Sequence, residues 1–177
     1  MSDIIAEVKA AKTASIQLSS VPTKVKDAAL EAMAEALDSH RSEILEANSK
    51  DLSNGEMLVD AGEISKSMFK RLAIDDAKID GMIDGIRDVI RLADPVGDVM
   101  SELDLDDGLT LFQIRCPIGM LGVIFESRPD VVPQIMSLCL KSGNGVAFKG
   151  GREAAESIRV LFRILRDAAA SVGIPAE

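Results

Sequence analysis

Two short polar segments in the second half of the chain contain the residues best suited to bind an anion. In the first, Ser127 and Arg128 follow an apolar run, and in the second the sequence KGGRE follows another apolar run. The candidate ligand-binding residues of the second segment are Lys149, Gly150, Gly151, Arg152 and Glu153. Lysine and arginine supply positive charge, the glycines let the backbone approach a ligand closely, and the start of a helix favours anions. These residue types indicate a phosphate or nucleotide site.

The flanking sequence predicts elements that bring these two segments together. The apolar run at residues 118–125 predicts a strand buried on both faces, and residues 146–148 predict a second, short strand. Apolar residues at helical spacing predict a helix from residue 130, which stops near Gly143, and a further helix is expected at residues 152–170. Parallel strands end at the same edge of their sheet, where ligands of open α/β sheets bind. We therefore expect the two polar segments to meet there.

Several motifs in this region resemble one known family. GVIFESRPDV (residues 122–131), LCLKSGNGV (138–146) and FKGGREA (148–154) are similar to signatures of the gamma-glutamyl phosphate reductases, within the aldehyde dehydrogenase superfamily. Residues 93–98 and 44–51 also resemble that family. A KGG tripeptide alone is a weak signal, whereas FESRP and KGG at this separation, with SGN between them, form a specific pattern.

The resemblance implies an α/β fold class in three parts. Residues 1–98 are expected to be the helical part of a cofactor-binding domain, residues 99–116 a β-hairpin extension, and residues 117–177 a Rossmann-like βαβα cofactor-binding unit. Members of the family are more than twice as long as this chain. The chain is therefore expected to be an amino-terminal portion in which the cofactor domain is incomplete.

The resemblance also implies a reaction. The family reduces L-glutamate 5-phosphate to L-glutamate 5-semialdehyde and phosphate with NADPH, in proline biosynthesis. A cysteine attacks the acyl phosphate, phosphate leaves, and hydride transfer then resolves the thioester; a thiol is the side chain best suited to this nucleophilic role. In the family that cysteine lies beyond residue 177, so no catalytic residue is expected here. Cys139 is expected in a helix core and Cys116 in a strand, because buried free cysteine behaves as a small hydrophobe.

Lys149 is the leading candidate for contact with the cofactor. The superfamily gives the lysine that ends this strand a role at the adenosine ribose, and Arg152 would add a second positive charge. Two cations near the ribose favour a 2′-phosphate, and therefore NADP over NAD. Glu153 could instead hold the ribose hydroxyls, and Lys149 could simply be a solvated lysine.

The substrate is expected to meet the turn that contains Ser127 and Arg128. Most aldehyde dehydrogenases have an asparagine in this turn that donates a hydrogen bond to the oxyanion, but this sequence has none. Ser127 could donate through its hydroxyl, and Arg128 could bind the acyl phosphate because a guanidinium forks onto phosphate oxygens. Alternatively, Glu126 pairs with Arg128 and the turn is purely structural. Asn144 is expected to fix the turn after its helix.

The first half of the chain predicts a series of helices. Residues 3–17 have an apolar stripe that includes Ile5, Val8 and Ile16, and a second helix is expected from Thr23 as far as Ala47, with a break at residues 38–39. The sequence then predicts a polar loop at residues 48–56 and a short helix at residues 57–61.

Two later helices have recognisable starts. Ser65 and Asp75 are expected to cap them, and the second has apolar residues at a 3.6-residue period up to the break at Pro95. His40 is expected to be a boundary residue without chemistry, because a single histidine without neighbouring ligand types does not define a site.

Residues 99–116 predict a β-hairpin around the Asp-Gly pair at residues 107–108. In the resembled superfamily this extension pairs with strands of another subunit, which implies a homo-oligomer. The alternative is a surface hairpin without a partner. The oligomer is the favoured interpretation because isolated hairpins are only marginally stable.

Composition excludes several classes of partner. The net charge is −9, with −10 in the first 117 residues and +1 in the remainder, which argues against nucleic-acid and anionic-membrane partners. No apolar run approaches the length of a membrane span, and the first residues lack a secretory signal. The two cysteines lack metal-ligand spacing, so no metal site is expected, and a cytoplasmic location is the default.

Two functional hypotheses remain open at this point. The first is an enzyme, in which the chain is the front portion of an NADP-dependent acyl-phosphate reductase and is inactive without the rest. The second is a truncated, non-catalytic module that binds a nucleotide or mediates oligomerisation.

Overall fold

The computed structural model describes residues 2–176. The first half is helical, with the elements α1 (Ser2–Leu18), α2 (Thr23–Ser39), α3 (Arg41–Asp60), α4 (Lys66–Leu72) and α5 (Asp76–Arg91). Then come β1 (Val99–Asp106), β2 (Leu109–Ile114), β3 (Met120–Ile124), α6 (Val131–Lys141), β4 (Gly145–Lys149), a 3₁₀ turn η1 (Arg152–Ala154) and α7 (Ala155–Ser171). The predicted α/β class, with its helices, hairpin and final βαβα unit, is confirmed.

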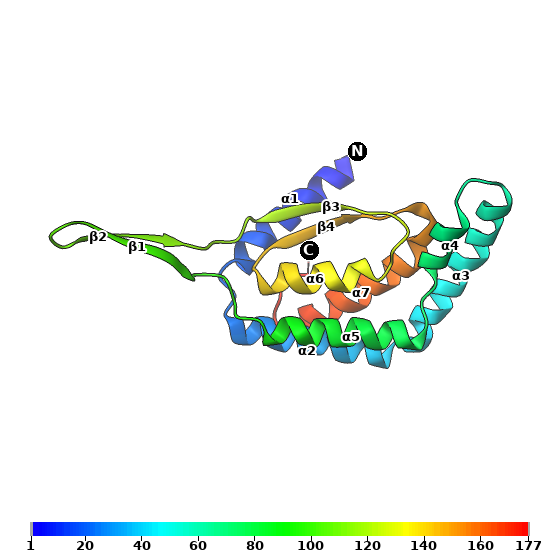
Figure 1. The fold of residues 1–177 in the computed structure, drawn as a ribbon, viewed down its shortest axis with the longest axis horizontal. Coiled ribbons are helices and arrows are strands. Elements are labelled where there is room, and N and C mark those ends of the chain that lie inside the picture. Colours follow the sequence, from blue (N-terminus) through cyan, green and yellow to red (C-terminus); the bar gives the residue numbers. More distant parts are fainter. Residues whose placement is uncertain (1, 177) are drawn as a thin grey trace.

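The helices pack in layers beside a small parallel sheet. Figure 1 shows β3 and β4 side by side, α6 and α7 next to them, and α2 and α5 beyond these helices. α1 and α6 contact β4, and the Phe148 ring of β4 meets the Phe162 ring of α7 edge to face, with centroids 6.2 Å apart. The β1–β2 hairpin projects away from this body (Figure 1).

One apolar core joins the helical first half to the βαβα unit. On α5 the buried residues recur at the predicted helical period: Ile79, Met82, Ile83, Ile86 and Val89. They share a cluster with buried residues of α2 and α7, among them Leu30 and Leu161. Ser65 and Asp75 cap α4 and α5 as predicted, accepting hydrogen bonds from the backbone N–H of Met68 and Lys78. Across residues 2–176, none of the helices combines the length and apolar character needed to cross a bilayer.

The predicted polar loop at residues 48–56 was wrong, because these residues belong to α3. The expected break in the helix that starts at Thr23 does occur, at His40. Beyond it, Asn48 and Asp51 are buried rather than solvated: Asn48 Nδ2 donates to Ser157 Oγ (3.0 Å), and Asp51 Oδ2 accepts from the Ser157 N–H (2.7 Å). Asn48 Nδ2 also donates to the Leu72 carbonyl (2.7 Å), and its Oδ1 accepts from the Ile74 N–H (2.8 Å). The polar sequence was misleading because all these hydrogen-bond partners lie more than twenty residues away in the chain, and those in α7 about a hundred.

Two other apolar patterns were also misinterpreted. The stripe of α1 through Ile5, Val8 and Ile16 is exposed, because this helix packs on the strands through smaller residues such as Ala14. The strand β3 is not buried on both faces: Ile118 before it and Ile124 at its end are 82% and 83% exposed. The reason is that β3 and β4 form a sheet of only two strands within residues 2–176.

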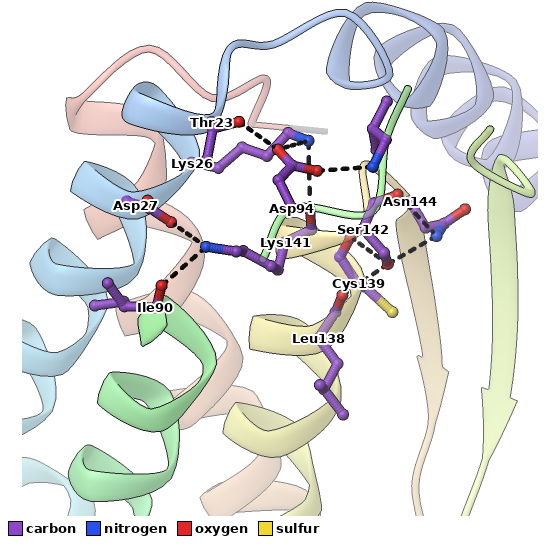
Figure 2. Close-up of polar contacts among 11 residues, drawn as sticks. Thr23, Lys26, Asp27, Ile90, Asp94, Leu138, Cys139, Lys141, Ser142 and Asn144 are labelled. Carbon is purple, nitrogen blue, oxygen red and sulfur yellow. Dashed lines mark hydrogen bonds and ion pairs between the residues drawn. The ribbon is translucent and has the colours of Figure 1, made fainter. Parts of the chain in front are cut away.

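Two buried lysines connect the helical layer to the end of α6, as Figure 2 shows. The side chains of Lys26 and Lys141 are 1% and 4% exposed. Lys26 Nζ donates to Asp94 Oδ2 (2.8 Å) and to the carbonyl of Lys141 (3.3 Å), while Lys141 Nζ donates to Asp27 Oδ1 (2.6 Å) and to the carbonyl of Ile90 (3.0 Å). These contacts fix the root of the hairpin and the turn between α6 and β4 on the helices.

Asp94 should contribute strongly to stability because it neutralises a buried cation. Burial by itself raises the pKa of Asp94, but hydrogen bonds from Lys26, the Val96 backbone and Thr23 outweigh it, so the pKa is lowered. Asp94→Ala leaves Lys26 charged and short of a partner, and we expect a loss of about 3 kcal/mol in the free energy of unfolding, measured by urea denaturation at neutral pH.

The pH dependence gives a second measure of the same contact. A lowered folded-state pKa means that the stabilisation is present above the unfolded-state value of about 3.9 and is lost as the pH falls through the folded-state value. Asp88→Ala, which removes one partner of the exposed Asp88–Arg91 pair, is the control and should cost less than about 1 kcal/mol. Equal effects of the two substitutions would contradict this account.

Candidate functional site

Parallel pairing of β3 and β4 brings the two polar segments to one edge of the sheet. Ile124 pairs with Lys149 in the register, and the Phe125 N–H donates to the carbonyl of Lys149 (3.1 Å). The chain therefore leaves both strands side by side, and residues 126–128 meet residues 150–153. This is the juxtaposition that the strand order predicted.

Ser127 and Glu153 make the closest polar contact at this edge. Ser127 Oγ donates to Glu153 Oε1 (2.5 Å), and the Ser127 N–H donates to the same oxygen (3.1 Å). Ser127 is 1% exposed and has φ = 40°, which is the left-handed region that serine seldom adopts. Burial raises the pKa of Glu153, but the hydrogen bonds from the Ser127 hydroxyl and from two backbone N–H groups outweigh it and lower the pKa.

The glycine pair is closely packed against side chains at the same place. A Cβ on Gly150 would lie 2.3 Å from Ile158 Cδ1, and a Cβ on Gly151 would lie 2.2 Å from Glu153 Oε1. Gly151 has φ = −68°, so its backbone does not itself require glycine. The missing side chain leaves room for the Glu153 carboxylate, which the sequence did not reveal.

The candidate cations of the site remain accessible. Lys149 and Arg152 are exposed, and neither makes an ion pair within the described part of the chain. Arg128 is about half exposed and pairs with Asp130 (2.8 Å), which raises the pKa of the guanidinium. The alternative partner considered for Arg128, Glu126, is not the residue it contacts. Two unpaired cations beside a glycine pair can bind an anionic ligand.

Asn144 lies at the opposite end of the strands and, as predicted, makes hydrogen bonds within the turn after α6. Its side-chain oxygen accepts from the Gly119 N–H (2.8 Å), and its amide nitrogen donates to Ser142 Oγ (2.9 Å; Figure 2). Gly143 has φ = 72°, the left-handed conformation expected after the helix. These contacts set the positions from which β3 and β4 start.

Neither cysteine lies at the candidate site. Cys139 is buried in α6, as expected, and burial raises the pKa of its thiol. Cys116 is exposed and lies after β2 in a segment without regular structure, so its prediction as a strand residue was wrong. Both cysteines line a groove of about 560 Å³ between the hairpin root and the end of α6. Within residues 2–176, no cluster of three or more His, Cys, Asp or Glu side chains could hold a metal.

Comparisons with known proteins identify relatives over nearly the whole chain. No protein-family model matches. A gamma-glutamyl phosphate reductase from Methanosarcina barkeri is 60% identical over 175 residues, covering 98% of this chain and 39% of the relative. Another from Acetivibrio thermocellus is 46% identical over 164 residues, covering 93% and 37%. The chain thus spans about two fifths of the length of the curated relatives it matches.

Solved structures give the same result. The gamma-glutamyl phosphate reductase of Thermotoga maritima has a TM-score of 0.90 at 38% identity, covering 97% of this chain and 41% of that one. A probable aldehyde dehydrogenase from Listeria monocytogenes has a TM-score of 0.71 at 16% identity, covering 99% and 35%, which shows a shared fold.

The fold, with its Rossmann-like unit, is therefore one shared with part of the solved aldehyde dehydrogenase structure. The chain is a homologue of gamma-glutamyl phosphate reductases, and the resemblance noted in its sequence is confirmed.

Proposed function

We propose that this chain forms part of an NADP-dependent reductase that converts L-glutamate 5-phosphate to L-glutamate 5-semialdehyde and phosphate. The observation that carries the proposal is 60% identity to a gamma-glutamyl phosphate reductase across nearly the whole chain. The edge of the β3–β4 sheet, with its exposed cations, would receive the cofactor. When bound, NADPH supplies the hydride. The nucleophilic cysteine lies outside this chain in the proposal, because Cys139 is buried and Cys116 precedes β3 at the far end of the sheet.

Lys149 and Arg152 are the proposed cofactor-binding side chains, with Gly150 and Gly151 keeping the approach to the backbone open. Their two positive charges favour the 2′-phosphate of NADP. The alternative in which Glu153 holds the ribose hydroxyls is weakened, because Glu153 Oε1 already accepts two hydrogen bonds from Ser127.

Arg128 is the proposed contact for the acyl phosphate of the substrate. Its guanidinium is about half exposed and lies in the turn that follows β3. Ser127 is a weaker candidate for the oxyanion than the sequence indicated, because its hydroxyl and its N–H both donate to Glu153. Guanidinium–phosphate contacts are charge-assisted and bidentate, which suits binding of a phosphate that will leave.

The hairpin is the proposed oligomerisation surface, and the proposed partner is a second copy of the chain. Its apolar residues are about half exposed: Val99, Met100, Leu103, Leu105, Leu109, Leu111, Phe112 and Ile114. A two-stranded hairpin that projects from the body with so much apolar surface is marginally stable alone. We also propose a cytoplasmic location for the chain.

Lys149→Ala should weaken NADPH binding to the chain by about 1.5–3 kcal/mol, because a charged hydrogen bond is lost. Isothermal titration calorimetry would measure this, and the salt dependence of binding should also fall. Lys24→Ala, at an exposed lysine on α2, is the matched control and should bind NADPH as the wild type does. An unchanged affinity in Lys149→Ala would exclude this lysine from the site.

Catalysis is tested by following NADPH consumption with the chain alone and with a joined protein. The joined protein is this chain followed by the part of the Methanosarcina barkeri reductase that lies after the matched region. We expect reduction of the acyl phosphate by the joined protein only. Activity of the chain alone would contradict the placement of the nucleophile, and inactivity of both with retained NADPH binding would favour the non-catalytic nucleotide-binding module.

Leu111→Lys combined with Phe112→Lys should reduce the mass of the particle that the chain forms in solution, because the two substitutions place positive charges on the apolar surface of the hairpin. Light scattering after size-exclusion chromatography would measure the mass. Leu92→Lys, at a comparably exposed leucine after α5, is the control and should leave the mass unchanged. A monomeric wild-type chain would contradict self-association through the hairpin.

A further inference from the structure

The turn after β3 is held in an unusual conformation by a residue from the other side of the site. Among the non-glycine residues in the range 2–176, Ser127 alone has a positive φ, and it is almost completely buried. Residues in such conformations persist where the surrounding structure fixes them. Here the fixing group is the Glu153 carboxylate, whose Oε1 accepts from both the N–H and the hydroxyl of Ser127.

The carboxylate is itself held in a space shaped for it. Gly151 has no Cβ, and a methyl group there would lie 2.2 Å from Glu153 Oε1 and 2.6 Å from Glu153 Cδ. Glu153 is positioned by η1, which starts immediately after the glycine pair. Against the effect of burial, the hydrogen bonds from Ser127 favour the ionised carboxylate and lower the pKa of Glu153. The loop after β4 therefore determines the shape of the turn after β3.

We propose that Glu153 is a positioning residue, which fixes the turn of residues 126–129 and thereby places Arg128 for the acyl phosphate. The proposal rests on the proposed function for its substrate, but the contact between the two loops does not depend on it. Glu153 acts through Ser127 and touches neither cofactor nor substrate. Its role is distinct from that of Lys149 and Arg152, which stand exposed beside it.

The first test measures amide hydrogen exchange in residues 126–129 of this chain. Glu153→Ala should raise the exchange rate of the Ser127 amide about tenfold or more, because its acceptor is lost. Glu153→Gln keeps a carbonyl acceptor and should restore most of the protection. Gly151→Ala should raise exchange without altering Glu153, because the added methyl displaces the carboxylate. Gly81→Ala, an open position on α5, and Glu156→Ala are the controls, and neither should alter exchange there.

The second test separates positioning from cofactor binding. In the joined protein, Glu153→Ala should raise the KM for the acyl phosphate about tenfold, and Glu153→Gln should recover it, while the Kd for NADPH stays within about twofold of the wild type. A purely structural role would lower stability without raising the KM for the acyl phosphate selectively over the Kd for NADPH. Thermal melting of each variant checks that it is folded.

The outcomes distinguish the two proposals. Unchanged Ser127 exchange in both Glu153→Ala and Gly151→Ala would overturn the inference. A loss of NADPH affinity in Glu153→Ala as large as that in Lys149→Ala would also overturn it, because Glu153 would then be a cofactor ligand. If the wild-type chain does not bind NADPH and yet Glu153→Ala raises the exchange rate of the Ser127 amide, the proposed function fails. The positioning of the turn by Glu153 then still stands.

Discussion

The pairing of β3 with β4 is the constraint on which the candidate site depends. Ile124 lies opposite Lys149, so one residue of slippage would separate the two loops and reverse the faces of the strands. Only two strands hold this register within residues 2–176, and their outer residues remain exposed. Asn144 compensates at the start of the strands, because it accepts from the Gly119 N–H and bonds to Ser142. Contacts at the start of the two strands therefore help to position the edge at their other end, where the cations lie.

Buried polar groups, together with the apolar core, connect the two halves of the chain. Lys26 and Lys141 lie in the interior, where an unpaired charge is costly, and each is met by a carboxylate and a carbonyl. Asn48 and Asp51 act in the same way between α3 and α7. Such contacts specify a unique arrangement of helices, since any other packing would leave these groups without partners.

The charges at the candidate site divide into two groups. Lys149 and Arg152 are exposed to solvent and available to an anionic ligand. The Glu153 carboxylate beside them instead accepts a hydrogen bond from Ser127. Lys149 and Arg152 therefore remain free of carboxylate partners in the described part of the chain, although the chain as a whole carries a charge of −9. In KGGRE, where Glu153 was considered as a ligand for ribose hydroxyls, its hydrogen bonds to Ser127 disfavour that role.

The sequence alone determined the class of the fold, its hairpin and its βαβα order, because apolar periodicity and turn residues such as Gly143 are local signals. It also placed Ser127 and Lys149 at one edge, since parallel strands share their carboxyl ends. Only the tertiary structure decided that Asn48 belongs to a buried helix and that Glu153 bonds to Ser127. In both cases the hydrogen-bond partner lies far away in the sequence, and no local pattern records it.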